Sequence, residues 1–195
     1  MNNKLSAKDL FSLEEYARRR PEFRARVMEH KAHRRLQLGP HLTLCFEDRL
    51  TMQYQIQEML RVERIFEEAE IRNELDTYNP LIPDGTNWKA TLLIEYPDPD
   101  ERRVALAQLR GIELAVALRV EEFPPVCPVA DEYLERTTEE KTSSVHFLRF
   151  DLTADMIRAL KEGAALAAGV DHASYSFALQ DVPEILRESL VADLA

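Results

Sequence analysis

The stretch ATLLIEYPDPDERRVALAQLRGIELAVALRV, residues 90–120, decides the fold. Its first part, Ala90 to Tyr96, is rich enough in apolar residues to predict a strand. Asp98-Pro-Asp-Glu101 then begins a helix, because it supplies a capping side chain, a proline in the first turn and acidic residues at the positive helix end. The helix is expected to reach Arg110, where Gly111 ends it. The alternation from Ile112 to Val120 predicts a second strand, so the segment is one β-α-β unit.

A second β-α-β unit follows a proline-containing loop at 121–143. It comprises a strand from Val145 to Asp151, a helix from Ala154 to Glu162 and a short strand from Ala164 to Ala168. Two such units in tandem are typical of a ferredoxin-like β-α-β-β-α-β core in a mixed or antiparallel sheet. A turn at 169–172, a strand at 175–179 and a closing helix at 183–194 complete an α+β fold whose sheet core spans residues 87–180.

An N-terminal layer of helices and one strand is expected to lie against this core. Ser12, with Glu15 three residues later, predicts a helix start. Pro21 is expected to kink this helix or to open a second one, and the helical pattern continues to about Leu36. Alternating apolar residues predict a strand at 41–46. Asp48 then begins a long helix that is expected to run to Arg72, before a loop at 78–85. The layer therefore spans residues 1–78 of a chain that is expected to form one domain, 1–195.

Two polar residues interrupt the apolar side of the long helix. At about 100° per residue, six apolar side chains share one arc that should face the core: Met52, Ile56, Met59, Leu60, Val62 and Phe66. Gln55 and Glu63 project into this arc, whereas Gln57 lies on the side that is expected to be wet. A buried carboxylate is costly unless it is paired, so a buried Glu63 needs a partner.

The preceding helix offers partners for Glu63. His30 and Arg34 share a face with Phe23 and Val27, because the four residues follow i, i+4, i+7 and i+11 spacing. A contact from Arg34 or His30 to Glu63 is therefore a hypothesis. Two interpretations stay open for Glu63: a structural one, in which it is paired or simply exposed, and a functional one, in which it lines a polar pocket or ligates a metal.

The composition excludes several classes of protein. At 195 residues, with 45% hydrophobic and 31% charged residues, the chain is globular rather than disordered. It has no apolar run long enough for a membrane span and no signal-peptide pattern, so a cytoplasmic location is expected. Cys45 and Cys127 lie outside any C-x-x-C motif. The net charge of −10 argues against nucleic-acid binding, although residues 18–35 are locally basic.

Motifs that would carry chemistry are weak. His30 and His33 have a spacing that helical metal sites use, but the neighbouring basic residues would repel a divalent ion, so no metal is predicted. Asp171-His172 is interpreted as a turn rather than as an acid–base pair. His146, on a predicted strand, is interpreted as a satisfied core or surface histidine. No catalytic residue and no cofactor is predicted.

Several short blocks resemble a bacterial family of unknown function whose members have about this length. The blocks are Ser12–Tyr16, Glu22–Arg26, Phe46-Glu47, Gln55–Met59, Glu63–Ile65, Asn79–Pro83 and Val170–His172. The family's genes often neighbour those of rubrerythrin-like and iron–sulfur oxidoreductase proteins, and the resemblance therefore implies a redox or peroxide-defence setting. His30 and His33 stand where the family is expected to have lysine and arginine, which counts against a metal site on them.

Two functions compete at this point. The preferred one is a non-catalytic accessory or interaction protein in a cytoplasmic redox or peroxide-defence system, with a redox protein as its partner. Its candidate surfaces are the basic N-terminal helix, the loop at 121–143 and the wet helix face. The alternative is an enzyme or ligand-binding protein whose polar pocket is formed by Gln55, Glu58 and Glu63, beside His30 and Arg34. Homo-oligomerisation is left open.

Overall fold

The fold is described from a computed structural model, which places residues 3–132, 138 and 140–195. The six α-helices of these residues are α1 (Leu13–Ala32), α2 (Arg49–Glu63), α3 (Glu68–Tyr78), α4 (Pro99–Gln108), α5 (Ala154–Lys161) and α6 (Glu184–Val191). The eight strands are β1 (Arg35–Gln37), β2 (Leu42–Glu47), β3 (Asn87–Ile94), β4 (Val116–Val120), β5 (Val129–Ala130), β6 (Val145–Asp151), β7 (Leu166–His172) and β8 (Tyr175–Leu179). Part of the predicted loop at 121–143, namely residues 133–137 and 139, lies outside the described residues.

The strands form two antiparallel sheets, which confirms the α+β class. One sheet has the order β1-β2-β3-β6-β5, and the other has the order β4-β7-β8. The ferredoxin-like core is not formed, because its four expected strands are divided. Strands β3 and β6 pair with each other in the first sheet, whereas β4 and β7 pair in the second. Each β-α-β unit therefore crosses from one sheet to the other instead of closing within one.

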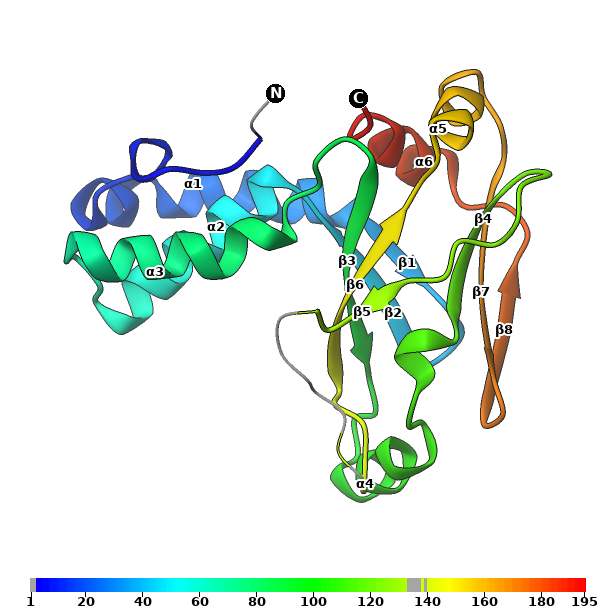
Figure 1. The fold of residues 1–195 in the computed structure, drawn as a ribbon. Helices are drawn as coiled ribbons and strands as arrows, with labels where there is room; N and C mark the ends of the chain where they lie inside the picture. Colours follow the sequence, from blue (N-terminus) through cyan, green and yellow to red (C-terminus); the bar gives the residue numbers. More distant parts are fainter. Residues whose placement is uncertain (1–2, 133–137, 139) are drawn as a thin grey trace.

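The main core lies between the two sheets. Alternate residues of the central strands face it, and cross-strand neighbours such as Trp88 and Phe150 are both fully buried. The Trp88 indole N–H donates to the carbonyl of Leu190 at 2.9 Å, which ties α6 to β3. Helices α5 and α6 cover one end of the sheets, and α4 lies at the other end (Figure 1).

Helices α1, α2 and α3 form an arm that extends to one side of the sheets (Figure 1). The arm has small apolar clusters of its own, because α2 buries Met52, Ile56 and Leu60 against α3 and the N-terminal segment. Tyr16, Phe23 and Val27 of α1 form a second cluster with Tyr54 of α2. The arm is thus stabilised by packing among its own helices.

The long helix expected from Asp48 to Arg72 is in fact two helices. Helix α2 ends at Glu63, and Arg64 adopts a left-handed conformation with φ of 58°. The Ile65 N–H then bonds to the Leu60 carbonyl at 2.9 Å, and Ile65 is buried beside Leu60. The chain turns here because burial of Ile65 and the antiparallel packing of α3 compensate for the left-handed residue.

Three smaller predictions were also wrong. Helix α1 passes Pro21 and ends at Ala32, and the residues expected to extend it form β1 instead. Pro21 is tolerated because the Ala17 carbonyl, which loses its helical donor, lies on an exposed turn. Ile112–Leu114 is a 3-10 turn rather than the start of a strand. Residues 169–172 belong to β7 rather than to a turn, since β7 pairs with strands on both sides.

Within the described part of the chain, every helix is either too short or too polar to serve as a membrane span.

Candidate functional site

Glu58 fastens α2 to α1. Its Oε1 accepts hydrogen bonds from the Tyr16 hydroxyl at 2.6 Å and from Arg20 Nε at 2.7 Å, and its Oε2 accepts from Arg20 Nη2 at 2.9 Å. The Arg20 guanidinium is the main reason that the pKa of Glu58 falls from its ordinary 4.5 to about 2. Burial, assisted by the hydrogen bond to Glu58, raises the pKa of Tyr16. These contacts occupy the carboxylate, so its role here is structural.

We expect Glu58→Gln to lower the free energy of unfolding by about 1.5 kcal/mol at pH 7, since charge-assisted hydrogen bonds to Arg20 are lost. Between pH 4.5 and 2 the unfolded chain binds a proton that folded Glu58 does not. The stabilisation by the carboxylate is therefore complete above pH 4.5 and is lost as the pH falls toward 2. Urea titrations at pH 7 and pH 3 measure this.

The matched control for that experiment is Glu68→Gln, which breaks an exposed pair with Arg72. It should change the free energy of unfolding by less than about 0.5 kcal/mol. A difference between wild type and Glu58→Gln that is as large at pH 3 as at pH 7 would contradict the assignment.

Glu63 is not buried, which is an outcome that its structural interpretation left open. It is the last residue of α2 and is exposed to solvent. The charged group near Glu63 is another acid, Glu74 on α3. Burial is the main reason that the pKa of Glu74 is raised, and the negative charge of Glu63 raises it further. Gln55 is half-buried, whereas Gln57, expected on the wet side, is fully buried. The Gln57 side chain bonds to both the N–H and the carbonyl of Phe11.

Arg34 and His30 lie together at the opposite end of α2 from Glu63. The Arg34 side chain is 2% exposed. It donates to the Phe46 carbonyl at 3.1 Å, to Ser189 Oγ at 2.9 Å and to Asp193 Oδ2 at 2.5 Å. His30 Nε2 lies 2.5 Å from Oδ2 of Asp48, the residue that caps α2.

The predicted contact of Arg34 or His30 with Glu63 is therefore wrong. A helix of the length of α2 separates its two ends by about 20 Å, at 1.5 Å per residue. Arg34 instead joins the end of α1, the end of β2 and the closing helix α6. Burial raises the pKa of Asp193, while the Arg34 charge opposes that effect. The five predicted site residues are thus spread along the arm rather than gathered around one pocket.

The sequence pattern did not predict a buried polar cluster that is centred on His146. His146 is fully buried; its Nδ1 lies 2.6 Å from Asp131 Oδ2 and its Nε2 lies 2.8 Å from Thr142 Oγ1. The Thr142 hydroxyl also lies 3.3 Å from Glu113 Oε2. Carboxylate, imidazole and hydroxyl in this order resemble an acid–base relay. Thr142 is only 1% exposed, however, so a substrate cannot reach its hydroxyl in this conformation.

Two buried charged residues, Glu47 and Lys89, were also not predicted from the sequence. They lie on the face of the larger sheet that is opposite the main apolar core. Glu47 accepts hydrogen bonds from the hydroxyls of Thr51 and Thr91, each at 2.7 Å. Lys89 lies opposite Glu47 on the next strand, with its Nζ 3.8 Å from Glu132. Burial lowers the pKa of Lys89. A strand that alternates apolar and polar residues gives no hint that its polar side is also covered.

Two cavities that are bordered by described residues lie away from the five predicted residues. One of about 450 Å³ is bordered by Gly85, Ile157 and Ala195, and another of the same size is bordered by Ile94, Tyr96 and other residues. Neither borders Gln55, Glu58, Glu63, His30 or Arg34. A polar pocket at those residues thus has no support from these cavities.

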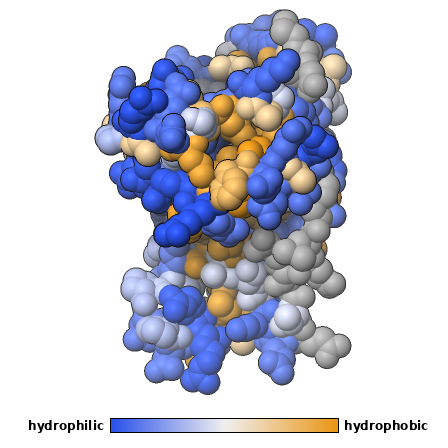
Figure 2. Space-filling view, turned by 90° about the vertical axis from the view of Figure 1, so that its left-hand side faces the viewer, coloured by the Kyte–Doolittle hydropathy of each residue, from blue (hydrophilic) through white to orange (hydrophobic). Residues whose placement is uncertain are grey.

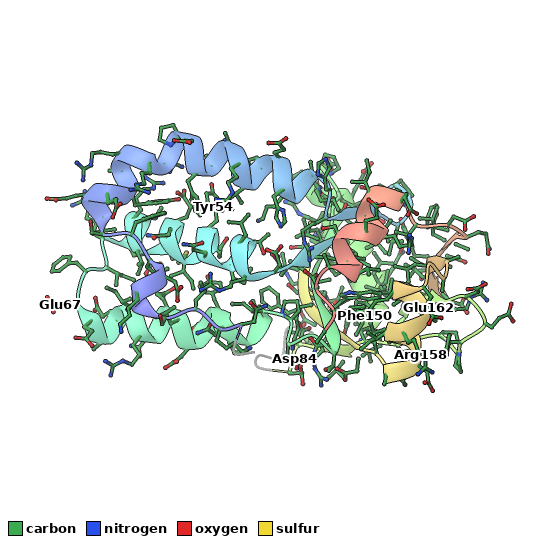
Figure 3. All side chains as sticks on the ribbon, turned by 90° about the horizontal axis from the view of Figure 1, so that it is seen from above. Tyr54, Glu67, Asp84, Phe150, Arg158 and Glu162 are labelled. Carbon is green, nitrogen blue, oxygen red and sulfur yellow. The ribbon has the colours of Figure 1, made fainter. Side chains whose placement is uncertain are left out.

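Large apolar side chains are exposed at the outer end of the arm. We define the outer end as residues 11–15 and 61–71, where α1 begins, α2 ends and α3 begins. Val62 is 63% exposed and Phe66 is 70% exposed, although both were expected to face the core. Figure 2, which views the arm end-on, shows apolar residues gathered there among hydrophilic ones. Glu67, next to Phe66, lies at the tip in Figure 3.

Comparisons with known proteins place this architecture in a family without assigning it an activity. The crystal structure of a novel protein of unknown function from Burkholderia pseudomallei is similar, with 50% sequence identity and a TM-score of 0.94. The match covers 98% of this chain and 100% of that one. A comparison with curated proteins gives no match. The model of the family described as "Protein of unknown function (DUF3501)" matches residues 4–194, which is nearly the whole chain. The protein therefore belongs to the DUF3501 family.

Proposed function

We propose that this protein is a non-catalytic interaction protein whose partner binds the outer end of the arm. The observation that carries the proposal is the exposure of Phe66 and Val62, at 70% and 63%. Single exposed apolar residues are ordinary on protein surfaces. Here two large ones lie within five residues at the tip of a projecting element, where neither packing nor folding accounts for them. Exposed apolar groups that gather within a polar rim mark interaction sites.

The polar residues that would support an enzyme have structural partners instead. Arg20 and Tyr16 occupy Glu58, and Asp193 with two backbone carbonyls occupies Arg34. Each group is therefore bound before any ligand arrives. A pocket at these residues would first require the helices of the arm to separate, which supports an interaction role over a catalytic one.

We also propose the cellular system in which the protein acts. The family resemblance supports a cytoplasmic redox or peroxide-defence system, and a redox protein is the partner that we propose. The geometry contributes a different kind of support, because a projecting arm can reach a partner without obstruction by the sheets (Figure 1).

A photoreactive benzoylphenylalanine placed at Phe66 tests the proposal in the source bacterium. We expect one discrete adduct with a second protein, which mass spectrometry identifies. The same group at Ile185, which is 61% exposed on α6, serves as the control and should not give that adduct. No adduct from position 66, or the same adduct from both positions, would overturn the proposal.

Affinity for the purified partner then gives the quantitative test. Phe66→Asp should weaken binding at least about 10-fold, or about 1.4 kcal/mol, because buried aromatic residues dominate interface energies. Ile185→Asp should leave binding unchanged. Both variants should unfold close to the wild-type midpoint, since neither side chain packs in a core. Equal binding by both variants would exclude the outer end as the contact surface.

A further inference from the structure

The apolar centre of the outer end has an acidic border. Four exposed glutamates of this region have no ion pair among the described residues: Glu14, Glu63, Glu67 and Glu70. Its other charges are largely satisfied within the arm, because Arg61 pairs with Glu58 and Glu68 pairs with Arg72. Arg64 is the remaining basic residue that has no ion pair among the described residues. The surface that a partner meets is therefore negative.

Helix stability accounts for only part of this charge. Glu67 and Glu70 lie at the start of α3, and Glu14 lies at the start of α1, where acidic side chains stabilise the positive helix end. Glu63 lies at the end of α2, where the helix is negative and a carboxylate is unfavourable. It also lies close enough to the half-buried Glu74 for the two charges to repel. Folding alone thus gives no reason for an acid at Glu63.

A second copy of the chain would fit this surface poorly. Two outer ends that face each other would oppose their acidic borders, and like charges across an interface cost free energy. A basic surface would instead neutralise Glu63 and its neighbour Glu74 while an apolar group covers Phe66 and Val62. Charge complementarity and the apolar centre thus favour the same kind of occupant.

We infer that the partner is a different protein that presents lysine or arginine side chains around an apolar contact, with one cation placed to meet Glu63. This inference rests on the proposed function, because it concerns the same surface. It specifies that the partner surface is positively charged and that Glu63 is the residue that contacts this charge.

The test uses the partner identified from the Phe66 adduct and a charge reversal, Glu63→Lys. We expect this variant to bind at least 10-fold more weakly and to unfold no earlier than wild type, since the change suits the helix end and removes the repulsion with Glu74. The control is Glu162→Lys, an equal charge change just after α5, on the body of the molecule and away from the arm (Figure 3). It should bind like wild type. Wild-type affinity should also fall as salt rises from 50 to 300 mM, because salt screens the attraction between the acidic border and a basic partner.

The outcomes separate this inference from the proposed function. If Phe66→Asp weakens binding while the two lysine variants bind alike and salt has no effect, the partner is not basic and only the inference fails. If position 66 gives no adduct, the proposed function fails with it. An adduct of twice the monomer mass that contains only this chain would identify a second copy and would overturn the inference.

Discussion

Replacing Arg34 with methionine is expected to lower the free energy of unfolding by about 3–5 kcal/mol, the range seen when one member of a buried ion pair is removed. Asp193 is itself largely buried, with its side chain 14% exposed, and would lose its cation. The carbonyls of Phe46 and Glu47 would also lose the hydrogen bonds that they accept from the Arg34 guanidinium. Methionine nearly matches arginine in length, so a cavity contributes little to the loss. Urea unfolding at pH 7 measures the change.

Two further variants isolate the charge effect at Arg34. Arg35→Met changes the exposed neighbour and should shift stability by less than about 0.5 kcal/mol. The double variant Arg34→Met with Asp193→Leu removes both charges and should recover a large part of the loss, because no unpaired charge then stays buried. If Arg34→Met behaves like Arg35→Met, the junction of α1, β2 and α6 does not depend on the ion pair.

Local sequence signals predicted where elements begin. Ser12 accepts the Glu15 N–H as expected from the capping pattern, and Asp98 accepts two N–H groups at the start of α4. These contacts lie within three residues, so the sequence contains all that is needed to infer them. The pairing of β4 with β7 depends instead on residues about fifty positions apart. Nothing in either strand alone distinguishes that partner from β6 or β3.

The turn at Arg64 shows a different limit. Helix ends are usually marked by glycine or asparagine in the left-handed conformation, and here an arginine adopts it. The apolar pattern continues through the turn, so the helical spacing predicted that Phe66 faces the core, although the chain has already turned away from it. The surface that we propose as functional is therefore the one at which the pattern was most misleading.

The polar residues were located better than their partners. Arg34 was predicted to share an apolar helix face, Glu58 belongs to the block that resembles the family, and both bind opposite charges. Their partners, however, lie 159 and 38 positions away in the chain. His146 was assigned to a strand as a satisfied residue, and its hydrogen bonds agree with that. The Thr142 hydroxyl lies only four positions from His146 in the chain, but the acidic groups around it come from segments that local patterns could not bring together.

His146→Leu is expected to lower the free energy of unfolding by about 3 kcal/mol, the second large effect. Leucine fills a similar volume but cannot make the hydrogen bonds of His146 to Asp131 and Thr142. Asp131 makes the cost higher than for an ordinary histidine. It is a non-glycine residue with φ of 49°, a conformation that its contacts must compensate. Those contacts include its Oδ1, which accepts the Phe147 N–H, and its Oδ2, which bonds to His146. Removal of the imidazole therefore weakens the support of a strained residue as well as a hydrogen bond.

Thermal and urea unfolding of His146→Leu beside His33→Leu measures this effect, since His33 is exposed and its replacement should be nearly neutral. A large loss would mean that Asp131, His146 and Thr142 act as a polar core that holds the ends of β5 and β6. A wild-type midpoint for His146→Leu would mean that the cluster contributes nothing to folding. A buried carboxylate, imidazole and hydroxyl in hydrogen-bond contact would then have no structural reason to exist, and the acid–base relay rather than the arm would become the first candidate for function.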